Sequence, residues 1–296
     1  MSDWSSSSSP SGPPSPLDLR EIAPGIFWQE VPSATIPPYS ATACYWVVGG
    51  GHAWLVDAGD DSPAAKAALL AAHEALHAPR LERVIVTHWH RDHSGGARGL
   101  QDRLGARVVA HPDDAHRVRL VLPDPPVFEG PETLPGQAPG GHTVTLVHAP
   151  GHTAGQINVW FSGLRLLLAG DNVLGRTTTV IVPPDGHLRT YQKTLARLIA
   201  LSPRLIGPGH GEPLADGGDV LQWYAQHRAD REAQVLAILA GGPHTLLELA
   251  EAVYAGEGPD TVAAGKLMLS AHLEALMEEG RVALRRTRDY ELVVGE

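Results

Sequence analysis

One ten-residue segment carries four side chains that could bind metal ions. It reads Thr87-His88-Trp89-His90-Arg91-Asp92-His93-Ser94-Gly95-Gly96. Imidazole and carboxylate are the ligands that zinc and its neighbouring transition metals prefer. Histidines two residues apart on an extended loop can point to one side, while Asp92 and His93 turn toward a second point nearby. Composition alone gives roughly 0.003 such matches per chain, so the segment indicates metal chemistry.

Three further candidate ligands lie in glycine-containing loops. His152 is in Ala149-Pro150-Gly151-His152-Thr153-Ala154-Gly155, Asp171 is in Ala169-Gly170-Asp171-Asn172, and His210 is in Gly207-Pro208-Gly209-His210-Gly211. Each loop directly follows an apolar run that favours a strand, and glycine lets the backbone of such a loop approach its neighbours closely. This repeated arrangement predicts that one site gathers all the candidate ligands: His88, His90, Asp92, His93, His152, Asp171 and His210.

The set His-x-His-x-Asp-His, then Gly-His, Gly-Asp and Gly-His, resembles the metallo-β-lactamase superfamily over residues from about 20 to 215. The resemblance implies an α/β fold, an αββα sandwich. It implies that one metal is held by His88, His90 and His152, and the other by Asp92, His93 and His210, with Asp171 bridging the two. It further implies that Asp57, in Leu55-Val56-Asp57-Ala58-Gly59, supports the histidine loop from behind the ligands.

Such a site predicts two Zn(2+) per chain and hydrolytic chemistry. Two divalent ions, two aspartates and one bridging hydroxide leave a charge near +1, which polarises a carbonyl or phosphoryl oxygen. Bound water would lose its proton near neutral pH, so no serine or cysteine nucleophile is needed. We expect Asp92 and Asp171 to act in catalysis. Trp89, Thr177 and Thr178 are expected to border the substrate pocket, although the threonines could equally form a polar turn before a strand at Val180–Val182.

The candidate ligands sit among elements typical of a layered α/β domain, which we expect to span residues 17–218. Residues 1–16 form a Ser/Pro/Gly tract that predicts a disordered tail. A helix at Tyr191–Leu201 is expected within the domain, and Gly105 could end another. The predicted strands are Tyr45–Val48, Ala53–Val56, Val84–Val86, Arg107–Ala110, Thr143–Val147, Ile157–Phe161, Leu164–Leu168 and Arg204–Ile206.

Residues 219–296 show a different pattern. Helical periodicity at Val220–Leu239, Leu246–Tyr254 and Val262–Glu279 precedes a hairpin pattern at Val282–Leu284 and Tyr290–Val294, which together predict a winged helix-turn-helix domain. From residue 220 onward the chain carries 12 acidic and 7 basic side chains, a net charge of −5. A nucleic-acid reader normally shows the opposite balance.

Composition limits the partners and the compartment. The chain of 296 residues has a formal net charge of −10, which argues against double-stranded DNA as a partner. No apolar run reaches the roughly 18 residues that span a bilayer, so no membrane partner is expected. Cys44 is the only cysteine, which excludes an internal disulfide and suits a reducing, cytoplasmic location. The oligomeric state is not predicted.

The substrate stays open between two classes. The histidine segment, Gly170–Gly175 and Tyr224–Arg228 are similar to the β-lactamase-like protein group, which includes a mammalian mitochondrial endoribonuclease and which fungal polyketide thioesterases resemble. That resemblance implies either cleavage of single-stranded RNA or hydrolysis of a small ester or acyl thioester, as in glyoxalase II.

Two other functional classes compete with a binuclear hydrolase. A mononuclear iron dioxygenase would use His88, His152 and Asp171, but it leaves Asp92, His93 and His210 without a role. A non-catalytic nucleic-acid binder would use the winged helix, which the acidic balance of that region disfavours.

Overall fold

The computed structural model describes residues 19–131, 134, 136–286 and 289–293. The predicted tail at 1–16 lies outside these residues. By its contacts the chain divides into a first unit of residues 1–149, 155–179 and 201–217, and a second of residues 150–154, 180–200 and 218–296. None of the described helices is both long and apolar enough to cross a lipid bilayer.

The first unit contains a seven-stranded sheet in which the strands pair in sequence order. Its first three pairings are antiparallel and its last three are parallel. Because parallel strands end at the same edge, the loops after β4, β5 and β6 emerge side by side. The strands are β1 (Leu19–Ala23), β2 (Ile26–Pro32), β3 (Ala41–Gly49), β4 (His52–Val56), β5 (Arg80–Ile85), β6 (Arg107–Val109) and β7 (Phe128–Glu129).

A second sheet of the same unit has the order β12-β11-β10-β9-β8. Within it β10 and β11 are parallel neighbours, so the loops that follow them also emerge side by side. The strands are β8 (Val144–His148), β9 (Ile157–Phe161), β10 (Leu166–Gly170), β11 (Leu205–Pro208) and β12 (Leu214–Ala215).

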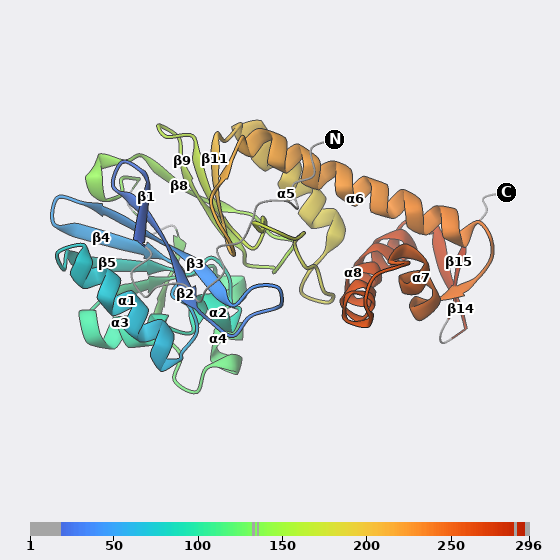
Figure 1. The fold of residues 1–296 in the computed structure, drawn as a ribbon, viewed down its shortest axis with the longest axis horizontal. Coiled ribbons are helices and arrows are strands. Elements are labelled where there is room, and N and C mark those ends of the chain that lie inside the picture. The colour runs from blue at the N-terminus through green and yellow to red at the C-terminus, as the bar shows by residue number, and fades with distance from the viewer. Residues whose placement is uncertain (1–18, 132–133, 135, 287–288, 294–296) are drawn as a thin grey trace. The chain divides into compact units, whose positions relative to one another are not determined.

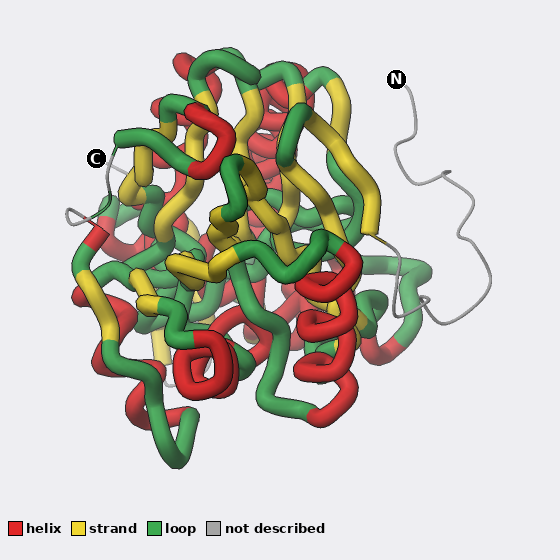
Figure 2. The backbone as a smooth tube through the Cα atoms, turned by 90° about the vertical axis from the view of Figure 1, so that its left-hand side faces the viewer, coloured by secondary structure: helices red, strands yellow, loops and turns green. Residues whose placement is uncertain are grey.

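Alternating side chains of the central strands build two cores. In β3, Cys44 and Trp46 pack with α1 (Pro63–Ala75) and α3 (Ala97–Leu104), whereas Tyr45 and Val47 pack with residues of the second sheet. This period of two places the helices on one face of the first sheet and the second sheet on the other. Figure 1 shows α1 and α3 along the first sheet, and Figure 2 shows the strands of the molecule in yellow. Burial on both faces explains why β3 reads as a continuous apolar run.

Most of the predicted elements are confirmed, with shifted ends. Ile157–Phe161 is reproduced residue for residue, and Gly105 ends α3 in the left-handed conformation with φ 69°. The predicted strand at Val180–Val182 is wrong. Its carbonyl groups are used in loop contacts, because Val180 O accepts from His152 Nδ1 and Val182 O accepts from the Gly186 amide. The sequence analysis did not predict β1, β2, α1 or α4 (Pro112–Val121).

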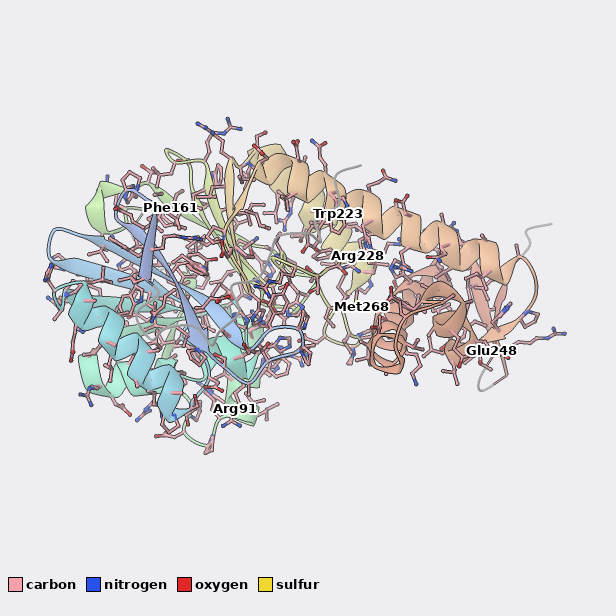
Figure 3. The ribbon with its side chains drawn as sticks, in the orientation of Figure 1. Arg91, Phe161, Trp223, Arg228, Glu248 and Met268 are labelled. Atoms are coloured by element: carbon pink, nitrogen blue, oxygen red, sulfur yellow. The ribbon has the colours of Figure 1, made fainter. Side chains whose placement is uncertain are left out.

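The second unit is built mainly from helices. The apolar faces of three of them enclose a core that includes Val235, Leu249 and Leu273. Thr245 caps α7 through reciprocal bonds with Glu248, which is labelled in Figure 3. The elements are α5 (Leu188–Leu201), α6 (Gly217–Leu239), β13 (His244–Thr245), α7 (Leu246–Val253), α8 (Pro259–Glu278), β14 (Val282–Arg286) and β15 (Asp289–Leu292).

A three-stranded sheet has the order β13-β15-β14, with β13 between α6 and α7 and the hairpin β14–β15 after α8. The sequence of helices and strands matches the predicted pattern, but the assignment as a winged helix stays a prediction.

A buried histidine in the second unit predicts acid sensitivity. His272 of α8 is 1% exposed, and burial together with the charges of Arg228, Arg231, Arg189 and His227 lowers its pKa to about 3. Arg228 is labelled on α6 in Figure 3. The His272 ring binds a proton near pH 6.5 in the unfolded chain but only near pH 3 in the folded chain. The unfolding free energy is therefore fully kept above pH 6.5 and decreases as the pH falls below it.

We therefore expect His272→Leu to unfold less readily than the parent at low pH. Between pH 7 and pH 4.5 its loss of unfolding free energy should be smaller by roughly 2 kcal/mol. Urea unfolding at several pH values measures this difference, with His116→Leu at an exposed position of α4 as the control. Equal pH dependence in both variants would contradict it.

Candidate metal centre

The side chains of Asp92, His93 and His210 form one compact group. Their ligand atoms lie within 4.8 Å of one another. His93 Nε2 is 3.2 Å from His210 Nε2, which is 3.4 Å from Asp92 Oδ2. Main-chain contacts fix the group, because the Ala58 amide donates to His93 O and Thr42 Oγ1 donates to Asp92 O. Residues from the ends of β5 and β11 are thus brought to one point.

A second group lies beside the first and shares an acidic residue with it. His88, His90 and Asp171 present ligand atoms within the same 4.8 Å limit, with His88 Nε2 2.9 Å from His90 Nδ1. Asp171 divides its carboxylate between the groups. Its Oδ1 is 3.2 Å from His93 Nε2, and its Oδ2 is 3.9 Å from His88 Nε2. This is the arrangement that a bridging ligand requires.

Hydrogen bonds fix which ring nitrogen of His88, His93 and His210 faces the centre. Asp57 Oδ2 accepts from His93 Nδ1 at 2.8 Å, and Ala41 O accepts from His210 Nδ1 at 2.8 Å. Thr87 donates its hydroxyl proton to Asp57, so its oxygen accepts from His88 Nδ1 at 3.1 Å. Each of these Nδ1 atoms is therefore the donor, and Nε2 is the nitrogen that faces the centre and whose lone pair a metal ion would use.

Asp57 accepts hydrogen bonds from the histidine loop. It directly follows β4 with φ 59°, is 2% exposed, and accepts from the Thr87 amide as well as from the Thr87 hydroxyl and His93. A single carboxylate thus orients two candidate ligand histidines.

His152 belongs to the second unit by its contacts. It lies in the short stretch 150–154, and its Nδ1 donates to Val180 O at 2.6 Å. This bond directs its Nε2 away from Val180, with the same tautomer as His93 and His210. Its expected role as a ligand stays a prediction.

The centre is short of positive charge. Burial would lower the pKa of His93, but the carboxylates of Asp171, Asp57 and Asp92 raise it well above its usual value. Burial would likewise raise the pKa of Asp171, but His210 and His93 hold it well below its usual range. Carboxylates that demand cations, together with inward lone pairs, fit the predicted metal ions in both groups.

The expected role of Trp89, Thr177 and Thr178 in the substrate pocket stays a prediction. The Trp89 ring meets His90 edge-on at 4.6 Å between centroids. Thr177 is exposed and Thr178 half-buried, and both precede loop residues at 180–182 rather than a strand. Arg91, labelled in Figure 3, is exposed beside the ligands.

The sequence analysis missed Tyr39. Its ring stacks on His210 with centroids 5.1 Å apart, and its hydroxyl oxygen accepts from the amides of Arg176 and Thr177. Tyr39 therefore connects the β2–β3 loop with the candidate ligand His210 and with residues 176–177. No local pattern marks it, since Pro37-Pro38-Tyr39 reads as an ordinary turn.

A third group of possible ligands, His111, Asp113 and His148, satisfies the same distance limit. The two rings are stacked at 4.0 Å with an interplanar angle of 7°. Because a metal lies in the plane of each ligand ring, two parallel rings in this arrangement cannot share one ion. We give this group no metal role.

Comparisons with known proteins agree with this architecture. The sequence profile of the Metallo-beta-lactamase superfamily matches residues 38–210. The "Beta-lactamase-like protein 2 homolog" of Drosophila melanogaster is 25% identical over 86% of this chain and 88% of its own length. The "Atrochrysone carboxyl ACP thioesterase" of Aspergillus fumigatus is 30% identical over 75% of this chain and 70% of its own length.

Solved structures show the same fold. A metallo-beta-lactamase family protein from Thermus thermophilus has a TM-score of 0.75 at 25% identity and covers 92% of this chain and 100% of its own. A beta-lactamase domain protein from Burkholderia ambifaria has a TM-score of 0.83 at 20% identity, with 96% of each chain covered. The predicted fold class, two sheets with helices in the metallo-β-lactamase arrangement, is confirmed. The chain belongs to the metallo-β-lactamase superfamily.

Proposed function

We propose that the protein is a binuclear, zinc-dependent hydrolase that cleaves an acyl thioester. The observation that carries the binuclear part is Asp171, whose two carboxylate oxygens face two different groups of histidines. A mononuclear iron dioxygenase gives no role to the group Asp92, His93 and His210, although these ligand atoms converge as closely as the others.

His152 completes the first ligand set in this proposal. The residues that flank its five-residue stretch in the chain belong to the first unit. Ala149 O accepts from Asn172 Nδ2 at 2.9 Å, next to Asp171, and the Ile157 amide donates to Thr87 O, next to His88. A stretch this short, tied at both ends beside the candidate ligands, supports His152 as one of them.

Two zinc ions would polarise the substrate carbonyl and lower the pKa of bound water to roughly 7. The chain's own residues supply orientation. Asp57, Thr87 and the Ala41 carbonyl hold the histidine tautomers, and Asp171 sets the spacing of the two groups. Trp89 contacts His90 of one group, and Tyr39 stacks on His210 of the other. Both rings offer apolar surfaces for an acyl chain. Neither a serine nor the buried Cys44 is needed as nucleophile.

Two observations favour a thioester over RNA. Two relatives at 30% identity are the "Atrochrysone carboxyl ACP thioesterase" and the "Thioesterase pkgB". The acidic balance of residues 220–296 also opposes a polyanionic substrate. The cytoplasmic location expected from the sequence stays a prediction.

A substrate panel on purified, zinc-loaded protein tests the proposal. Acyl thioesters of N-acetylcysteamine, simple lactones and labelled single-stranded RNA would be assayed in parallel. We expect thiol release from the thioesters, its loss after chelation, and its return when zinc is restored. His88→Ala should abolish it, while His116→Ala, an exposed histidine of α4 outside both groups, should leave it unchanged.

The other outcomes are equally informative. RNA cleavage without thiol release would replace the thioester by RNA as substrate. One iron per chain with oxygen uptake would overturn the binuclear hydrolase altogether.

A further inference from the structure

Asp114 is a buried carboxylate that lies outside both ligand groups. It occupies the first turn of α4 and is 1% exposed. The N-terminal end of a helix favours negative charge, because its unpaired amides carry partial positive charge. The ends of β5 and β6 lie side by side in the first sheet, so α4, which follows β6, begins next to the histidine loop that follows β5.

The two oxygens of Asp114 accept hydrogen bonds from two separate ligand loops. Oδ2 accepts from the Trp89 amide at 3.1 Å, at the residue between His88 and His90. Oδ1 accepts from the Gly155 amide at 2.7 Å, at the end of the stretch that carries His152. One carboxylate thus joins segments 66 residues apart in the sequence (155 − 89).

Gly155 is required for this contact. A Cβ at this position would lie 2.6 Å from Asp114 Cγ and 2.6 Å from Asp114 Oδ1. A non-glycine residue would therefore push the carboxylate away from one or both amides. The glycine of this loop is explained by its approach to Asp114.

We infer that Asp114 is a positioning residue that sets the spacing between the loop of His88 and His90 and the loop of His152. It acts on both loops through their main-chain amides. It therefore positions the loops of the first ligand set. In the second set, Asp57 orients His93 and the Ala41 carbonyl orients His210. This inference rests on the proposed function for the identity of the ligands.

The test measures metal affinity at each of the two sites. Asp114→Asn keeps the volume but presents an amide NH₂ to one of the two main-chain amides. We expect zinc affinity to fall about 10- to 100-fold at one site only, as when a partner that orients a ligand is removed. Dialysis against graded chelator should leave one zinc per chain where the parent keeps two. Excess zinc should restore turnover.

Asp113→Asn is the matched control, because Asp113 is next to Asp114 in the sequence but is exposed. This variant should keep both zinc ions. The visible spectrum of the cobalt-substituted protein identifies the site that is perturbed. Gly155→Ala approaches the same contact from the other loop and serves if Asp114→Asn does not fold. If Asp114→Asn and Gly155→Ala hold two zinc ions as tightly as the parent does, the inference is overturned. A parent that binds no zinc would instead overturn the proposed function.

Discussion

Replacement of Asp171 by asparagine is expected to reduce turnover on the order of 10²–10³-fold, the range for loss of a preorganised charged group at a reacting centre. The variant should also hold fewer than two zinc ions per chain. The reason is geometric. The carboxylate serves both histidine groups, with Oδ1 3.2 Å from His93 Nε2 and Oδ2 3.9 Å from His88 Nε2. An amide nitrogen in place of either oxygen offers no lone pair to a cation and adds no negative charge.

Metal analysis and turnover must be measured together for Asp171→Asn. Zinc content after dialysis reports the site, and kcat at saturating zinc separates lost metal from lost chemistry. Asp102→Asn is a suitable control, since Asp102 pairs with Arg98 on the surface of α3. Two tightly held zinc ions with undiminished turnover in Asp171→Asn would show that Asp171 does not bridge the two groups.

The positions of the candidate ligands could be predicted because each follows a strand. Apolar runs such as Ile157–Phe161 mark strands by themselves, and glycines mark the loops where the backbone approaches its neighbours. The parallel pairings β4–β5–β6 and β10–β11 then place the loops along the same edges. The sequence therefore indicated which loops lie along the same edges without indicating the distances between their side chains.

Positioning residues were invisible in the sequence for a physical reason. Asp114 acts on the amides of Trp89 and Gly155, and Tyr39 acts on the amides of Arg176 and Thr177. Main-chain amides are the same at every residue except proline, so such contacts leave no signature in residue types. Asp57 was found only because the resemblance to a family pointed to it.

The wrong strand at Val180–Val182 has a related cause. Its β-branched residues favour a strand locally, but the carbonyl of Val180 accepts from His152 and that of Val182 from Gly186. Local propensity gave way to one contact with a distant residue, His152, and to one turn contact with Gly186. The segment is more informative as a loop, because it fixes the tautomer of a candidate ligand.

Replacement of Gly209 by alanine should damage the metal centre from outside the ligand set. A Cβ there would collide with Asp171 Oδ1 and would lie 2.8 Å from the carbonyl carbon of Gly170. The backbone has little room to yield, since the Gly209 amide donates to Gly170 O at 2.8 Å and ties the ends of β10 and β11 together. We expect a loss of about 1–3 kcal/mol in unfolding free energy and displacement of the bridging carboxylate.

Zinc content, thermal unfolding and turnover of Gly209→Ala should therefore fall together, with zinc affinity lower by at least about 10-fold. Gly163→Ala is the matched control, because a Cβ at Gly163 meets open space. Retention of both zinc ions by Gly209→Ala would contradict the close approach on which the argument depends. The glycine before His210 thus has a specific task. It leaves room for the carboxylate of Asp171 at the position where two parallel strands bring both candidate ligands together.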